Sequence, residues 1–298
     1  MPTAASPALR YAEGLYRHML ESEIAALPEK LATVEALAGL ALLTGQCVLW
    51  FIFRFVVRSG PWHAEPGFTA HQLMYFPVGV YTAYYGCVHF FGNHHTTAAS
   101  RVLDYDPAGM HLSHLSLMVL LLWDIPTGLA VKELRNPLMI VHHIGFALTA
   151  YYIIVSGRNT YYALCFFGVV EVSSVFLCIA EVFHPRHKEY TAWLETAPSI
   201  IKALNDAVRA VFVLAFLLVR GLYFPYAVWA RYTPDMFELL ALPLPERRNM
   251  SDAQLWTPFF LGSAFSVLQL YWGHLLIQQA RKMLAAPKTE DGMGKKQP

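Results

Sequence analysis

The sequence predicts an all-α integral membrane protein with about seven transmembrane helices. Of its 298 residues, 56% are hydrophobic and only 14% are charged, and the mean hydropathy is +0.38. This composition is far more apolar than that of an ordinary soluble domain. Mostly apolar runs of about 20 residues, the helix length that spans ~30 Å of hydrocarbon, recur along the chain.

Seven of these runs predict the membrane helices. Their approximate ranges are 34–57, 71–92, 111–131, 137–157, 160–183, 201–230 and 254–280. The third run begins with His111 and His114 and ends near Pro126, and proline interrupts helical hydrogen bonding. We therefore expect the third helix to be short, kinked or partly interfacial.

The apolar runs also define the domain organisation, and the net charge excludes one class of partner. We expect an extramembrane segment over residues 1–33, a multi-span membrane domain over 34–283 and a polar tail over 284–298. The formal net charge of +1 gives no basic field for phosphates, which excludes nucleic acid as a partner. The four cysteines stand singly in apolar segments without metal-ligand spacing, so we expect them to be core residues.

Ionisable side chains inside the predicted spans are the candidate functional residues. A charge at membrane depth needs a partner, a wet cavity or a route to the surface, so such residues usually have a role. In chain order they are Asp124, His142, His143, Glu171, Asp206, Arg209, Arg220 and His274.

His142 and His143 lie in the middle of the fourth span. Consecutive helical residues point about 100° apart, so one imidazole would face the bundle and the other a neighbouring helix. One interpretation is polar glue, in which one histidine bonds Asp124 or a backbone carbonyl and the other packs at a helix contact. Another is a general base or a head-group cradle, because histidine titrates near neutrality. Metal ligation is a third.

Glu171, closely followed by Ser174, is the next candidate. A carboxylate in mid-span should be either neutral or paired with a cation, and Arg220 or a histidine of the pair is the expected partner. Asp206 and Arg209 stand three residues apart on the sixth span and predict a local ion pair near the membrane surface.

A second histidine group, between residues 89 and 114, invites comparison with membrane di-iron oxygenases. Those enzymes present histidines to iron from HxxxH and HxxHH boxes, and neither string occurs here. We therefore predict no metal site. His94 and His95 are expected to be exposed interfacial residues or loop hydrogen-bonders.

Taken in order, the polar motifs make the chain resemble the TLC-domain family, which includes ceramide synthases and the translocating-chain-associated membrane protein. The resemblance covers roughly residues 71–283. The motifs are Asp104-Tyr-Asp-Pro, Leu122-Trp-Asp124, Met139-Ile-Val-His-His143, Val170-Glu-Val-Ser-Ser174, Ala215-Phe-Leu-Leu-Val-Arg220 and Leu270-Tyr-Trp272.

The resemblance implies a TLC-type helical bundle around an elongated cavity that accommodates a lipid, with the histidine pair near its polar end. The lipid-binding residues expected on this basis are Asp124, His142, His143, Glu171, Ser174, Arg220 and Trp272. The candidates for catalysis are His142, His143 and Asp124.

One departure from the family pattern bears on function. Ceramide synthases carry a second His-Asp motif in the span after the histidine pair, whereas this chain has Glu171 in that neighbourhood and no His-Asp. Acyl transfer from acyl-CoA to a sphingoid amine is therefore disfavoured. The sequence is more similar to the non-synthase branch, whose members are associated with phospholipid composition and lipid handling.

The motifs and the resemblance leave three alternative functions. The first is binding or regulation of membrane lipids without ceramide synthase chemistry, with no cofactor other than a bound phospholipid or sphingolipid. The second is a lipid acyltransferase that uses His142 or His143 as base. The third is an accessory subunit of a larger complex, with other membrane-protein subunits as partners.

The family resemblance and the N-terminal sequence each predict which membrane holds the protein. The family resemblance implies the endoplasmic reticulum. An alanine-rich N-terminus with Arg10 and Arg17 makes the mitochondrial inner membrane the alternative, against which the acidic Glu13 argues.

Overall fold

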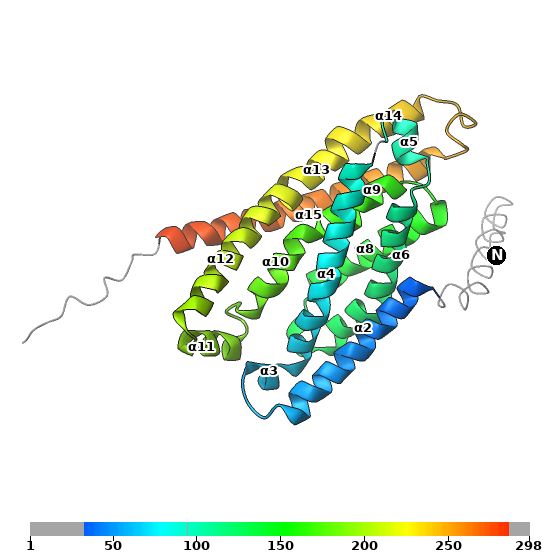
Figure 1. The fold of residues 1–298 in the computed structure, drawn as a ribbon. Coiled ribbons are helices and arrows are strands. Elements are labelled where there is room, and N and C mark those ends of the chain that lie inside the picture. Colours follow the sequence, from blue (N-terminus) through cyan, green and yellow to red (C-terminus); the bar gives the residue numbers. More distant parts are fainter. Residues whose placement is uncertain (1–32, 94, 286–298) are drawn as a thin grey trace, which may run out of the picture. The chain divides into compact units, whose positions relative to one another are not determined.

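The computed structural model describes residues 33–93 and 95–285, and all regular structure within these ranges is helical (Figure 1). Six helices there are long and apolar enough to cross a membrane, which confirms the predicted all-α, multi-pass fold. They cover Val34–Val56, Ala98–Ala130, Pro137–Ser156, Thr160–Val182, Ser199–Leu240 and Asp252–Arg281. The predicted N-terminal segment, apart from Thr33, and nearly all of the predicted tail lie outside the described residues.

The long helices consist of shorter elements, several of them π-helical. The α-helices are α2 (Val34–Phe51), α3 (Pro61–Ala64), α4 (Pro66–Gly92), α5 (Ala98–Val102), α6 (Pro107–Val119), α7 (Ile125–Ala130), α8 (Pro137–Ser156), α9 (Thr160–Leu164), α10 (Glu171–Val182), α11 (Lys188–Thr196), α12 (Ser199–Ala215), α13 (Phe224–Tyr226), α14 (Thr233–Leu240) and α15 (Asp252–Ala285). The π-helical segments are η1 (Ile52–Val56), η2 (Leu120–Asp124), η4 (Cys165–Val169), η5 (Phe216–Tyr223) and η6 (Ala227–Tyr232), and η3 (Lys132–Leu134) is a 3₁₀ turn.

Three predicted spans differ from the observed helices. The second is present as the 27-residue helix α4, which is not among the six helices apolar enough to cross a membrane. The third lies in α6, η2 and α7, which run from Pro107 to Ala130, so it is not short, and the π-helical segment η2 interrupts it; a partly interfacial position stays a prediction. The sixth continues to Leu240 rather than ending near residue 230, and Asp235 in this extension is paired with Arg101.

The described chain forms two compact units. Unit 1 contains residues 33–74 and 111–156, and unit 2 contains residues 75–110 and 157–285. Two helices, α4 and Ala98–Ala130, contribute residues to both units.

Unit 1 is built around α2, η2 and α8. η2 packs against both other elements, and Gly39 of α2 permits a close crossing, because a Cβ there would lie 2.8 Å from the carbonyl oxygen of Met118. Gln46, also on α2, is buried and donates a 2.9 Å hydrogen bond to the carbonyl of Gly67. Its side-chain oxygen accepts from the indole N–H of Trp123 at 3.4 Å, so both ends of this buried amide are bonded.

Unit 2 contains two packed apolar clusters. α10 lies along α12, α5 packs against α14, and α15 packs against η5 and η6 (Figure 1). One cluster joins α5, η6, α14 and α15 through Ala98, Val102, Leu103, Tyr232, Met236, Leu239, Met250 and Leu255. The second consists of Ala180, Phe212 and Phe216.

Large apolar side chains are exposed on most of the candidate spans, as expected of helices that face lipid. Leu37 on α2 is 58% exposed, Leu148 on α8 is 58% exposed and Phe260 on α15 is 62% exposed. In a soluble protein such a surface would be an aggregation liability. The helix Thr160–Val182 is the exception among the described spans, because none of its large apolar side chains is exposed.

The crossing between α4 and the Thr160–Val182 helix gives a test of the fold. A Cβ at Gly86 would overlap the backbone of Gly168, which cannot move away as a flexible side chain could. We predict that Gly86→Ala lowers the free energy of unfolding by about 1–3 kcal/mol, the usual cost of overpacking. Denaturant titration in mixed micelles measures this change.

Gly92 on the same helix is the matched control, because nothing lies within 4 Å of a Cβ placed there. Gly92→Ala should be neutral or slightly stabilising, since alanine favours helix over glycine by up to ~1 kcal/mol. Equal stability of the Gly86→Ala and Gly92→Ala variants would contradict the observed crossing.

Candidate functional site

Asp124 is the centre of a buried polar cluster in unit 1. It is the last residue of η2 and is only 6% exposed. Its Oδ1 accepts a hydrogen bond from Nε2 of His71 on α4 at 2.9 Å, and its Oδ2 accepts from Nδ1 of His143 on α8 at 2.6 Å. The carboxylate is thus held between two imidazoles, which supply the partners that a buried charge needs.

The two adjacent histidines of α8 have different surroundings, as their helical spacing predicts. The side chain of His143 is 27% exposed. His142 is 7% exposed, and its ring lies against that of Phe146 with centroids 4.7 Å apart. The expectation that one histidine bonds Asp124 is confirmed, and the other is buried against Phe146 of its own helix.

His71 is a member of the cluster that the sequence did not single out. Its ring stacks on the indole of Trp123, with centroids 4.8 Å apart and planes 18° apart. Trp123 precedes Asp124, so η2 supplies both the stacking surface and the carboxylate. A single histidine at the start of a predicted span does not indicate a role by itself. The role of His71 becomes visible only because the fold places it beside Asp124.

The bond between His143 and Asp124 determines what the imidazole can do chemically. A carboxylate that accepts from Nδ1–H fixes the neutral tautomer in which Nε2 is the proton-accepting nitrogen. Partial exposure of His143 brings this ring within reach of a molecule outside the packed interior. The pair can therefore accept a proton or a hydrogen bond from a hydroxyl or an amine.

Arg220 is the centre of a second buried cluster, in unit 2. It lies in η5 and is 7% exposed. Its Nε donates to the hydroxyl of Ser173 at 2.8 Å, and its terminal NH2 nitrogen donates to Ser174 at 2.6 Å and to Glu171 at 3.2 Å. The hydroxyl of Tyr75 donates to the other oxygen of Glu171 at 2.7 Å.

This arrangement confirms Arg220 as the expected partner of Glu171. The Nε of Arg220 also donates to the carbonyl of Val170, at 3.2 Å, immediately after the π-helical segment η4. An arginine bound by a carboxylate, two hydroxyls and a carbonyl is well satisfied, and losing either charge would leave the other buried and unpaired.

The remaining predicted residues have other contacts. Trp272 is partly buried against the apolar cluster of Ala180, Phe212 and Phe216. His274 is exposed and shares a 2.8 Å hydrogen bond with Gln278 on the same helix. By the unit boundaries, Asp124, His142 and His143 lie in unit 1, and Glu171, Ser174, Arg220 and Trp272 lie in unit 2.

The predicted local ion pair on the sixth span is wrong. Arg209 donates instead to the side-chain oxygen of Asn205 at 3.2 Å and to the carbonyl oxygen of Phe183. The carbonyl at the end of α10 satisfies the guanidinium, because the last carbonyls of a helix have no partner within it.

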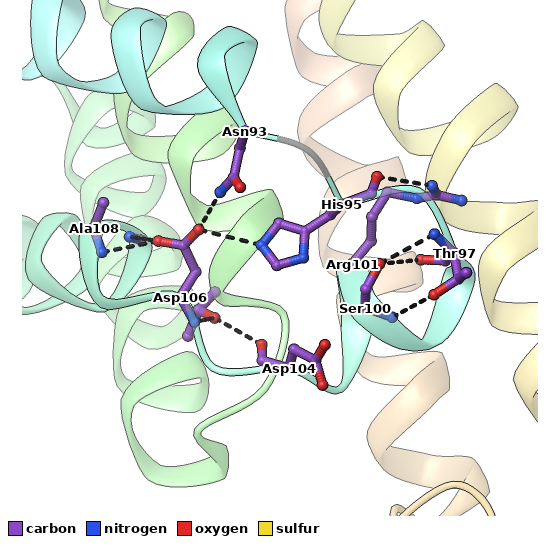
Figure 2. A network of polar contacts seen from close by, with 10 residues as sticks. Asn93, His95, Thr97, Ser100, Arg101, Asp104, Asp106 and Ala108 are labelled. Atoms are coloured by element: carbon purple, nitrogen blue, oxygen red, sulfur yellow. Dashed lines mark hydrogen bonds and ion pairs between the residues drawn. The ribbon is translucent and has the colours of Figure 1, made fainter.

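A polar network at the start of α6 surrounds Asp106 of the motif Asp104-Tyr-Asp-Pro, and the sequence did not predict its contacts (Figure 2). Asp106 is 5% exposed, and its Oδ1 accepts from the backbone N–H groups of Ala108 and Gly109 at 2.8 and 3.0 Å. Its Oδ2 accepts from the side-chain amide of Asn93 and faces Nε2 of His95 at 3.4 Å. Asp106 followed by a proline is the pattern of a helix N-cap, which could have identified it.

For His95 the second of the two expected roles is confirmed. Its side chain is only 17% exposed, and its Nε2 pairs with Asp106 from the loop between α4 and α5. His94 lies outside the described residues.

A third polar cluster in unit 2 is centred on Asp235. Arg101 forms a two-pronged ion pair with Asp235 at 2.7 and 2.5 Å, and the hydroxyl of Tyr162 donates to the same carboxylate at 2.5 Å. These residues belong to α5, α14 and α9 and hold the three helices together. This cluster could not be predicted from the sequence, because Asp235 lies beyond the predicted end of the sixth span.

Comparison with known families supports the resemblance seen in the motifs. The family model described as the TLC domain matches residues 62–278, more than half of the chain. No solved structure matches the chain.

The Arg220 cluster predicts a large and specific loss of stability. Arg220→Met should cost about 3–5 kcal/mol of unfolding free energy, because it leaves Glu171 without its cation. Arg220→Met combined with Glu171→Gln should recover part of this loss. Denaturant titration in mixed micelles measures both variants.

Arg231, exposed on the same long helix, provides the control. Arg231→Met should change the unfolding free energy by less than ~0.5 kcal/mol. If Arg220→Met were as mild as Arg231→Met, the buried ion pair would not be holding the helices.

Proposed function

The chain belongs to the TLC-domain family, and from this premise we propose that it binds or regulates membrane lipids through polar groups among its spans, without ceramide synthase chemistry. The multi-pass membrane fold supplies the setting. The observation that carries the proposal is the bond between Asp124, which is buried, and His143, which is partly exposed.

The role of His143 in this proposal is to bind a lipid head group. Asp124 orients the imidazole and keeps its outer nitrogen an acceptor, and a head-group hydroxyl or amine is the donor that such a nitrogen takes. His71, stacked on Trp123, keeps the carboxylate in place from the other side. His142 contributes packing rather than a head-group contact.

The polar residues of unit 2 have a different part in the proposal. Arg220, Glu171 and Ser174 are bound to one another, so we assign them first to holding the α10 and η5 helices together. Direct lipid contact by these residues and by Trp272 stays a prediction. The endoplasmic reticulum or the mitochondrial inner membrane as location, and an accessory role in a larger complex, also stay predictions.

A test of lipid binding compares variants purified in the same mild detergent. We expect His143→Ala and Asp124→Asn to lose most of the lipid that co-purifies with the wild-type protein, by roughly 10- to 150-fold in affinity if a charge-assisted bond of ~1.5–3 kcal/mol is removed. Mass spectrometry of the extracted lipids gives the molar ratio of lipid to protein.

His274→Ala is the matched control, because His274 is exposed and bonded only along its own helix. Unchanged lipid content in all three variants would count against the proposal. Loss of lipid in His274→Ala as well would show that the lipid is bound non-specifically at the surface.

The same geometry favours a second candidate function, a lipid acyltransferase. A histidine oriented by a carboxylate is the arrangement of a general base that takes a proton from a hydroxyl or amine during acyl transfer. With labelled acyl-CoA and hydroxyl or amine acceptors, activity should fall by about 10²–10⁴-fold in His143→Ala. Inactivity of the wild-type protein toward every acceptor class would eliminate this candidate and leave lipid binding.

A further inference from the structure

A cavity of about 420 Å³ lies in unit 2 and is lined by residues of α11 and α12. It shares no residue with the Asp124, Arg220 or Asp106 clusters. It is a shallow cavity open to the protein surface, and its three charged side chains, Glu195, Lys202 and Asp206, are exposed. The lining residues are Thr191, Leu194, Glu195, Lys202, Asn205 and Asp206.

The charges that line this cavity are of both signs. Lys202 donates from Nζ to the backbone carbonyl of Glu195 at 2.7 Å, which fixes its ammonium while two further N–H groups remain. Among the described residues, no cation pairs with the carboxylates of Glu195 and Asp206. Asp206 accepts only a long bond, 3.4 Å, from the amide of Asn205.

This combination complements a zwitterion better than a simple ion. An anion in the cavity would be attracted by Lys202 but repelled by two carboxylates, and a simple cation would be attracted by the carboxylates but would leave the ammonium of Lys202 without an anionic partner. A ligand with a phosphate at one end and an ammonium at the other satisfies all three groups. Carboxylates bind a primary ammonium through its N–H groups, whereas quaternary ammonium favours aromatic cages, and no aromatic residue is among the described residues that line this cavity.

The surface beside the cavity is suited to an acyl chain. Asp206 is followed at successive spacings of four residues by Ala210 and Leu214 on α12, and Leu218 lies further on in the π-helical segment η5. All four are exposed, and Leu214 and Leu218 are 59% and 51% exposed. These residues belong to the candidate span Ser199–Leu240, so they lead from the charged cavity into the apolar part of the helix.

From these observations we propose that the cavity between α11 and α12 binds the phosphoethanolamine head group of an aminophospholipid. Lys202 binds the phosphate, Glu195 and Asp206 bind the ammonium, and the acyl chains follow Ala210 and Leu214. This site is separate in its residues from the one proposed for His143 and does not depend on it.

Titration of the purified full-length protein with short-chain phosphatidylethanolamine in detergent, followed by native mass spectrometry, tests the proposal. Phosphatidylethanolamine should bind more tightly than phosphatidylcholine, which lacks ammonium N–H groups, and than phosphatidylglycerol, which lacks the cation. Lys202→Gln, Glu195→Gln and Asp206→Asn should each weaken binding by about two- to fivefold, the usual scale for exposed ion pairs. Lys202→Glu should weaken it further.

Glu189→Gln is the control, because Glu189 is an exposed carboxylate on the same helix that does not line the cavity. It should bind as the wild type does, and so should His143→Ala, which separates this site from the lipid site proposed above. Equal binding of the three lipids, or no change in the cavity variants, would overturn the proposal. Free O-phosphoethanolamine binding as tightly as the lipid would overturn the assignment to a lipid.

Discussion

The cost of placing charge among apolar helices is the constraint on which this structure depends. An unpaired ion at membrane depth is expensive, so each buried charge must find its partner within the protein. Asp124 is held by two histidines, Glu171 by Arg220 and Tyr75, and Asp235 by Arg101 and Tyr162. Each set joins helices that are distant in sequence, and each lies within one unit. The polar contacts therefore specify which helices pack together, while the apolar surface alone would not.

The π-helical segments put these charges in position. Asp124 is the last residue of η2, Arg220 lies within η5, and Glu171 follows η4 after a single residue. A π-helical turn shifts the side chains that follow it relative to a regular helix, and such turns are frequent at functional sites. Three π-helical segments therefore lie at or next to the charged residues of the Asp124 and Arg220 clusters, so the irregular backbone helps to position these side chains.

The sequence predicted the class of fold and most of the charged centres, because apolar length and intramembrane charge are both visible in one dimension. It predicted the partner of Glu171 and the unequal roles of His142 and His143. It could not reveal His71 or the Arg101 and Asp235 pair, whose importance comes only from contacts across the fold. The ion pair expected for Arg209 failed because a helix-end carbonyl and Asn205 compete for the guanidinium, and that competition depends on the α10–α12 packing.

The two histidines of α8 thus have different roles. His142 is buried and packs, whereas His143 is partly exposed and its imidazole is oriented by Asp124. For His143 to have the proposed role, a lipid must be the molecule that contacts its imidazole. A density map of the protein in nanodiscs of native lipid is the most direct measurement. We expect a head group within hydrogen-bond distance of His143. Ordered lipid on the outer faces of the spans, with protein side chains alone around His143, would contradict the account.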